Sequence, residues 1–95
     1  MNVLDITTKP FNGLTTEKLL KTDTAEAIMI NIEAGSSLPK HSTPKEALLL
    51  MFSGEASYTM NGVETHLTPG VTFIIPTNIE HAIVAKKDSI IFVIR

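Results

Sequence analysis

The sequence predicts an all-β domain, a sandwich or barrel, and three observations lead to this prediction. Short apolar segments recur along the chain, separated by turn residues about every 8–12 positions. Residues 27–33 (AIMINIE) alternate with a period of two, which indicates a strand with one buried face. Asn61 and Gly62 separate two further strand-like segments and form the strongest short signal for a β-hairpin.

Length and composition narrow the class of protein. The 95 residues correspond to a single domain, residues 1–95, and a net charge of -2 gives no basic surface for nucleic acid or anionic lipid. The chain has no cysteine, which excludes disulfides, thiol catalysis and zinc–thiolate sites. No apolar run approaches the roughly 18–20 residues of a membrane span, and residues 1–10 lack the features of a signal peptide. We therefore expect a cytoplasmic protein that binds neither nucleic acid nor membranes.

The first third of the chain predicts two or three strands. Val3, Leu4 and Ile6 are available for an edge strand, and residues 14–21 (LTTEKLLK) predict either a helical turn or a strand. In residues 27–33 the two faces of the expected strand are Ile28, Ile30 and Ile32 against Met29, Asn31 and Glu33.

Prolines shape the next part of the sequence. Residues 35–37 (GSS) end the preceding strand, and Pro39 and Pro44 predict an irregular backbone around His41. Residues 47–53 then predict a strand that is apolar on both faces.

A two-residue loop at Asn61-Gly62 fixes the expected register of the hairpin. Its apolar face pairs Met60 with Val63, Tyr58 with Thr65 and Ala56 with Leu67. The opposite face is polar, so we expect His66, opposite Ser57, to lie outside any pocket. The expected core side chains are Met29, Met51, Phe52, Tyr58, Met60, Phe73 and Phe92.

Three short strands are expected in the last part of the chain, at residues 71–75, 82–85 and 89–94. The last of them is strongly apolar and, if unpaired, would leave an adhesive edge. Such an edge favours association of two copies of the chain.

Two stretches share a spacing from glycine to histidine. In the first, Gly35 is followed by five residues and His41; in the second, Gly70 is followed by five residues, Pro76, four residues and His81. Turns followed by strands can bring both imidazoles together, and two neutral imidazoles suit a soft-to-borderline metal ion.

These stretches, residues 35–54 (GSSLPKHSTPKEALLLMFSG) and residues 70–85 (GVTFIIPTNIEHAIVA), resemble the two motifs of the cupin superfamily. The first cupin motif runs Gly, five residues, His-x-His, three or four residues, Glu, six residues, Gly. The second runs Gly, five residues, Pro-x-Gly, two residues, His, three residues, Asn. The resemblance implies a double-stranded β-helix, or jelly-roll, barrel, and family members of this size that pair as dimers imply a homodimer.

The sequence departs from the family pattern at several ligand positions. Thr43 stands where the second histidine of the first motif is expected. The glutamate, counted back from Gly54, falls at Ala47, and Glu46 stands one residue early. In the second motif Asn78 replaces the turn glycine and Ala85 replaces the final asparagine.

The resemblance therefore implies a metal site of His41 and His81, with Glu46 as a third ligand if a bulge turns it inward, and with Thr43 lining the pocket. Otherwise Glu46 is a surface residue, because a shift of one residue moves a strand side chain to the other face. The implied cofactor is one divalent ion of iron, manganese, nickel or zinc, or none.

Three functions follow from these observations. The first is a binding module whose barrel holds a small molecule or a weakly held divalent metal, which the aliphatic segment at residues 46–50 favours. The alternative is a metal-dependent enzyme, dioxygenase- or isomerase-like, that uses His41, His81 and Glu46. The third is a structural dimer with a filled barrel and no pocket chemistry.

Overall fold

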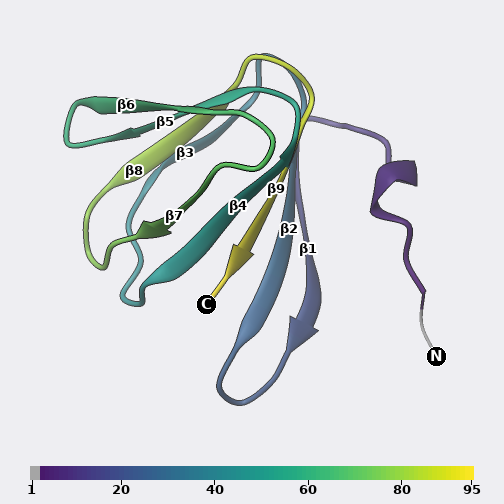
Figure 1. Ribbon diagram of the computed structural model, residues 1–95, viewed down its shortest axis with the longest axis horizontal. Helices are drawn as coiled ribbons and strands as arrows, with labels where there is room; N and C mark the ends of the chain where they lie inside the picture. Colours follow the sequence, from purple (N-terminus) through teal and green to yellow (C-terminus); the bar gives the residue numbers. More distant parts are fainter. Residues whose placement is uncertain (1–2) are drawn as a thin grey trace.

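Two antiparallel β-sheets face one another in the structure, a computed structural model that describes residues 3–95 (Figure 1). One sheet has five strands in the order β1-β2-β9-β4-β7, and the other has four in the order β3-β8-β5-β6. The described strands are β1 (Leu14–Lys21), β2 (Glu26–Ile32), β3 (Ser37–His41), β4 (Ala47–Ser53), β5 (Ala56–Met60), β6 (Val63–Leu67), β7 (Thr72–Ile75), β8 (His81–Ala85) and β9 (Ser89–Ile94). The prediction of an all-β jelly-roll barrel is confirmed.

The core lies between the two sheets and is built from the inward-facing positions of both. The five-stranded sheet contributes Ile30, Ile32, Ala47, Leu49, Met51, Ile75, Ile91 and Val93. The four-stranded sheet contributes Ala56, Tyr58, Leu67, Ile83 and Ala85. Each large apolar side chain buried in this way stabilises the fold by roughly 1.5–3 kcal/mol.

The hairpin of β5 and β6 has the predicted register. Met60 pairs with Val63, and Ser57 pairs with His66. Asn61 and Gly62 have φ values of 52° and 75°, the left-handed conformation that a two-residue type I′ turn requires. His66 is exposed on the outer face of the sheet, as expected, and its Nε2 lies 3.0 Å from Glu55 Oε1.

The N-terminal segment differs from its prediction. No edge strand forms from Val3, Leu4 and Ile6; residues Ile6–Thr8 form a short 3-10 helix, and residues 1–2 lie outside the described part of the chain. Asp5 caps this helix by accepting hydrogen bonds from the Thr7 backbone N–H at 2.9 Å and the Thr7 hydroxyl at 2.6 Å. This local capping satisfies the backbone there without a strand partner.

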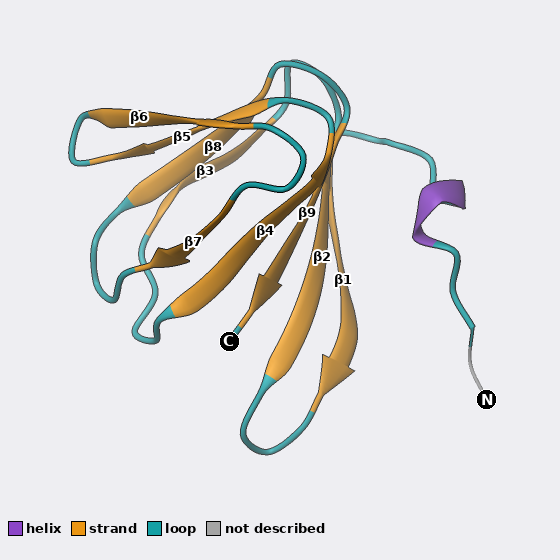
Figure 2. Cartoon of the chain, viewed as in Figure 1, coloured by secondary structure: helices purple, strands orange, loops and turns teal. Residues whose placement is uncertain are grey.

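Strand β1 decides between the two structures expected for residues 14–21, and strand β2 corrects the burial pattern expected for residues 27–33 (Figure 2). Residues 14–21 form strand β1 rather than a helical turn. The one-sided burial expected for residues 27–33 is wrong, because Met29 and Asn31 on the outer face are each 1% exposed. Both faces of the second half of β2 are therefore covered.

Pro39 lies within strand β3, where an irregular backbone was expected. β3 is at the edge of its sheet, a position that tolerates proline because one side of the strand needs no hydrogen-bond donor. The pairing with β8 shifts register between Leu38 and His41, so the irregularity is a local bulge.

The last strand corrects the expectation of a free apolar edge. β9 pairs with β2 on one side and β4 on the other, so it does not provide a free adhesive edge.

The expected core is corrected at one position. Met29, Met51 and Tyr58 belong to the buried set, whereas Phe52 is 43% exposed on the outer face of β4. Phe52 contacts Phe92 there, with ring centroids 5.6 Å apart.

No helix in the described part of the chain is long and apolar enough to cross a membrane.

A tight corner connects β4 to β5 and packs against the start of β9. Gly54 has a φ of 89°, and a Cβ at this position would lie 2.2 Å from the Asp88 carbonyl oxygen and 2.5 Å from Ser89 Oγ. Ser89 is fully buried, and its Oγ accepts a hydrogen bond from the Glu55 backbone N–H at 3.2 Å. The corner therefore requires glycine both for backbone conformation and for space.

We predict that Gly54→Ala destabilises the protein much more than Gly70→Ala. Both positions have positive φ, which costs a non-glycine residue about 1–2 kcal/mol, but nothing lies within 4 Å of a Cβ at Gly70. The clash at Gly54 adds about 1–3 kcal/mol. Urea unfolding of the two variants measures the difference, and equal losses in the free energy of unfolding would contradict the account of this corner.

Candidate functional site

Two histidines lie side by side on the inner face of the four-stranded sheet. His41 at the end of β3 pairs directly with His81 at the start of β8. Their ring centroids are 4.4 Å apart and their planes make an angle of 62°. The two Gly-to-His stretches of the sequence therefore meet at one point of the barrel. This separation is within the roughly 6 Å that one metal ion can bridge between two imidazoles.

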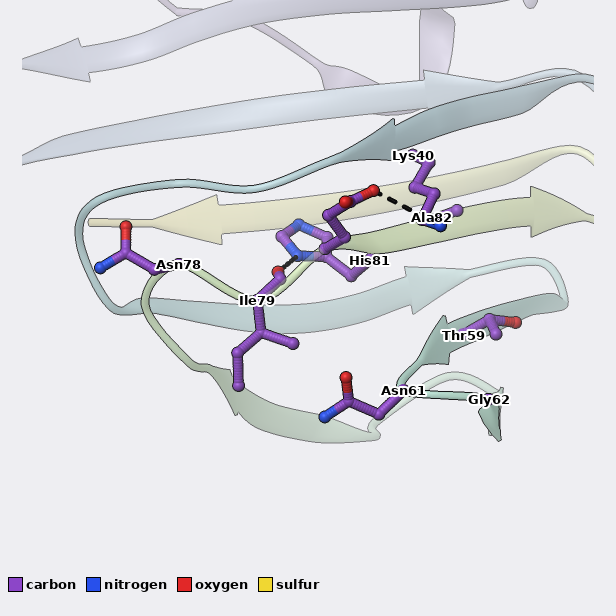
Figure 3. Close-up of a pocket in the computed structure, with 9 residues that line it drawn as sticks. Lys40, Thr59, Asn61, Gly62, Asn78, Ile79, His81 and Ala82 are labelled. Atoms are coloured by element: carbon purple, nitrogen blue, oxygen red, sulfur yellow. Dashed lines mark hydrogen bonds and ion pairs between the residues drawn. The ribbon is translucent and has the colours of Figure 1, made fainter.

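Both rings are held by the backbone two residues earlier in the chain. His41 Nδ1 lies 2.9 Å from the Pro39 carbonyl oxygen. His81 Nδ1 lies 3.0 Å from the Ile79 carbonyl oxygen, the contact drawn in Figure 3. A carbonyl oxygen can only accept a hydrogen bond, so each Nδ1 carries the proton. In the neutral rings each Nε2 then keeps its lone pair, the arrangement used for binding metals or accepting a hydrogen bond from a ligand.

His81 lies in a mostly apolar environment. It is 3% exposed, and its ring stacks on Tyr58 with centroids 5.5 Å apart. Burial lowers the pKa of His81 below its usual value of 6.5, and the neighbouring His41 lowers it further, while the Ile79 carbonyl opposes this shift. His81 is therefore neutral at pH 7. Burial also raises the pKa of Tyr58, which stays protonated and donates to Met60 Sδ at 3.6 Å.

The histidines line a cavity of about 340 Å³ inside the barrel. Most of its wall is aliphatic and comes from both sheets: Ile28, Ile30, Leu38, Ala47, Ile75, Ile83 and Val93. Its polar groups are His41, His81, Thr16, Thr43, Lys18 and Arg95. The cavity volume falls within the range of small-molecule sites, at the small end.

Thr43 and Glu46 lie differently with respect to this cavity. Thr43 lines it, and the Thr43 hydroxyl donates to the Lys45 carbonyl at 3.0 Å. Glu46 is exposed and precedes Ala47, whose side chain is buried and faces the cavity. The structure therefore does not bring the Glu46 carboxylate to the two imidazoles, because adjacent strand residues face opposite sides.

The set of donor groups at this cavity determines which metal ions it can hold. Within residues 3–95 no group of three or more His, Cys, Asp or Glu side chains converges on one point. Catalytic zinc sites have three protein ligands and structural zinc sites four. Two imidazoles do not fit a tightly held catalytic metal; they fit an ion that binds weakly and exchanges.

A larger hollow of about 530 Å³ lies at the end of the four-stranded sheet (Figure 3). It is bordered by the outward-facing Thr59 and Ala82 and by the turn at Asn61 and Gly62. Its charged side chains, Lys40 and Glu80, pair with each other at 3.5 Å and are both mostly exposed. We assign the chemistry to the smaller interior cavity, because both imidazoles and the aliphatic wall meet there.

Sequence reasoning missed Lys18, Thr16 and Arg95 in this cavity. Thr16 and Lys18 lie at inward positions of β1, opposite Ile30 and Ile28. Arg95 follows β9, two residues after Val93. The alternation of residues 14–21 was the available signal, but without the register of β1 on β2 it did not say which face was inward.

These features define a class: a small double-stranded β-helix barrel with two histidines at an interior cavity. A family model described as "Cupin domain" matches residues 28–94, so the chain belongs to the cupin family. No curated protein matches the sequence significantly.

Solved structures show the same fold. A protein with a double-stranded β-helix domain from Klebsiella pneumoniae is 21% identical, with a TM-score of 0.84 over 99% of this chain and 88% of that one. A cupin superfamily protein from Desulfitobacterium hafniense is 22% identical, with a TM-score of 0.83 over 90% and 79% of the two chains. A DMSP lyase from Ruegeria pomeroyi is 22% identical, with a TM-score of 0.77 over 86% of this chain and 45% of that one.

We predict that His81 makes stability fall on acidification. Its lowered pKa means that the unfolded chain binds a proton near pH 6.5 while the folded chain resists it. The contribution of His81 to the free energy of unfolding is therefore fully present above that pH and is lost as the pH falls through the pKa of the folded state. The loss is at most about 1.4 kcal/mol per pH unit for one proton. Urea unfolding between pH 7.5 and 5.5 in the presence of EDTA measures this decline.

The matched variants are His81→Phe, which keeps an aromatic ring against Tyr58, and His66→Gln on the exposed face. The decline is expected to be smaller in His81→Phe and unchanged in His66→Gln. An equal decline in all three proteins would show that His81 does not cause it.

Proposed function

We propose that this protein is a binding module whose barrel holds a small organic molecule, with a divalent metal bound only weakly at the histidine pair. The observation that carries the proposal is the pair itself: two imidazoles, each oriented by a backbone carbonyl, at a largely aliphatic cavity of about 340 Å³ that no carboxylate of residues 3–95 lines. A cavity of this kind favours apolar contact with a few orienting hydrogen bonds.

The anchored rings support the proposal because they need no rearrangement on binding. Each Nδ1–H is already used by a backbone carbonyl, so each Nε2 can accept a hydrogen bond from a ligand hydroxyl or amide. The Thr43 and Thr16 side chains add further polar groups at the same cavity. Groups held in place before binding reduce its entropic cost.

A metal-dependent enzyme is the second candidate. The hydrogen bond from each Nδ1 to a backbone carbonyl favours it, because ligating histidines commonly donate their other ring N–H to such a group. A DMSP lyase shares the fold, although a likeness at 22% identity concerns the fold alone. In this candidate His41 and His81 hold an iron, manganese, nickel or zinc ion, which would act as a Lewis acid when bound.

The location and assembly of the protein belong to the same proposal. The absence of cysteine agrees with a reducing cytoplasm. A homodimer is proposed as well, supported by the exposed apolar side chains Leu20, Phe52, Ile74 and Ile94 on the outer face of the five-stranded sheet. Exposed apolar groups gathered on one face are typical of contact surfaces.

Metal content separates the two candidates. Protein purified without chelators is expected to hold far less than one ion per chain by elemental analysis, because two imidazoles alone bind divalent ions weakly. About one tightly held ion per chain would overturn the binding-module proposal in favour of the enzyme.

Titration with Zn²⁺ tests the residues. We predict weak binding that His41→Ala and His81→Ala each reduce by about tenfold or more, since loss of one of two ligands removes half of the donor set. Glu46→Gln and His66→Ala are the matched controls, and both are expected to bind Zn²⁺ as the unaltered protein does. A clear loss in Glu46→Gln would place that carboxylate at the ion and contradict the exposed position described above.

A further inference from the structure

We propose that the ligand of the interior cavity is a small aliphatic carboxylate whose charged end is held by Arg95, with Lys18 beside it. The inference rests on the proposed binding function and adds the charge of the ligand and its orientation. It follows from a set of residues at the opposite side of the barrel interior from the motif histidines: Arg95, Lys18 and Glu26.

Strand pairing places these residues together. Glu26 and Arg95 are direct partners, since the Glu26 N–H donates to the Arg95 carbonyl at 2.6 Å and the Arg95 N–H donates to the Glu26 carbonyl at 2.9 Å. Lys18 on β1 pairs with Ile28, which faces the cavity. Arg95 directly follows β9, two residues after Val93, and lines the cavity together with it.

Glu26 fixes the Arg95 guanidinium by one edge. Arg95 Nε donates to Glu26 Oε1 at 2.7 Å, the one side-chain hydrogen bond that this guanidinium makes within residues 3–95. A guanidinium has five N–H donors in a planar fork, so its terminal Nη groups remain available for a second anion. A carboxylate matches this fork and can accept two parallel hydrogen bonds from it.

The charge balance at the cavity favours an anion. Lys18 and Arg95 both line it, and no Asp or Glu side chain does so among the described residues. Glu26 pairs with both cations, Lys18 at 3.5 Å, so the three side chains together keep one positive charge. Lys45 borders an adjoining hollow with Arg95, which adds a second positive charge near the opening. The chain as a whole is acidic, so this local excess is a feature of the site.

The remaining wall limits the rest of the ligand. Apart from the cations, the histidines and two threonines, the lining is aliphatic, with Ile28, Ile30, Ile83 and Val93 among its side chains. A cavity of about 340 Å³ accommodates a short chain or small ring but not a sugar polymer or a nucleotide.

The test compares two matched series of probes by NMR, using the methyl resonances of the cavity residues Ile28 and Ile83. The first series is the straight-chain monocarboxylates from propanoate to hexanoate, and the second is the corresponding uncharged amides. Because hydrogen bonds to charged groups are about twice as strong as neutral ones, we expect a carboxylate to bind at least about tenfold more tightly than its amide. Arg95→Gln removes this preference, Lys18→Gln reduces it, and the exposed Lys87→Gln leaves it unchanged.

The outcomes separate this inference from the function on which it rests. If the amides shift the cavity methyls and bind as tightly as the carboxylates, the inference is overturned and the binding function stands. If neither series shifts those methyls up to its solubility limit, both are overturned. The comparison within the unaltered protein does not depend on any variant folding, and Arg95→Lys, which keeps the charge but not the fork, is expected to retain only part of the preference.

Discussion

The pairing of β3 with β8 is the constraint on which the candidate site depends. It brings the strand that carries His41 against the strand that carries His81, and it places the two histidines opposite each other at the end of the ladder. The bulge between Leu38 and His41 matters here, because it changes which side of β3 faces the core. Without this one-residue shift, Leu38 and His41 would face opposite sides, and the imidazole of His41 would point away from the barrel.

The anchoring of both rings by backbone carbonyls has an energetic consequence. A buried polar ring without partners is costly, and one hydrogen bond to the preceding backbone satisfies half of each neutral imidazole. Both rings line the cavity, and Nε2 of neither ring makes a hydrogen bond within residues 3–95. The site therefore keeps an unused acceptor on each ring, which a ligand or a metal ion can satisfy. Lys18 and Arg95 line the same cavity from the sheet opposite the histidines, and their positive charge suits a small carboxylate with an aliphatic body.

The parts of the fold that depend on residues close together in the sequence were predictable. The hairpin at Asn61-Gly62 followed from a turn that demands a left-handed backbone, and its register followed from the turn length. The N-terminal segment was mispredicted because apolar residues there suggested a strand, whereas Asp5 offered the backbone a cap instead. The burial of both faces of β2 could not be predicted from the sequence either, because it depends on which segments cover the outer face and not on the residues of the strand itself.

The candidate site was likewise predictable only in part. The spacing of glycine, proline and histidine indicated the two imidazoles, and the missing third ligand was visible as Thr43 and as the displaced Glu46. The cationic side of the cavity was not predictable, because Arg95, Glu26 and Lys18 come from three strands whose neighbours are set by the sheet order. Strands β1, β2 and β9 join the two ends of the described chain, and no local pattern specifies that contact.

The protonation state of the two rings tests the central claim most directly. Two-bond nitrogen–proton correlation NMR at pH 7.5, with EDTA present, distinguishes the two neutral tautomers and the imidazolium form for each histidine. The account predicts that His41 and His81 both carry a proton on Nδ1 and that Nε2 of the buried His81 is unprotonated, with the exposed His66 as the internal reference. A ring of either histidine without a proton on Nδ1, or a charged His81 at this pH, would contradict the account of the site.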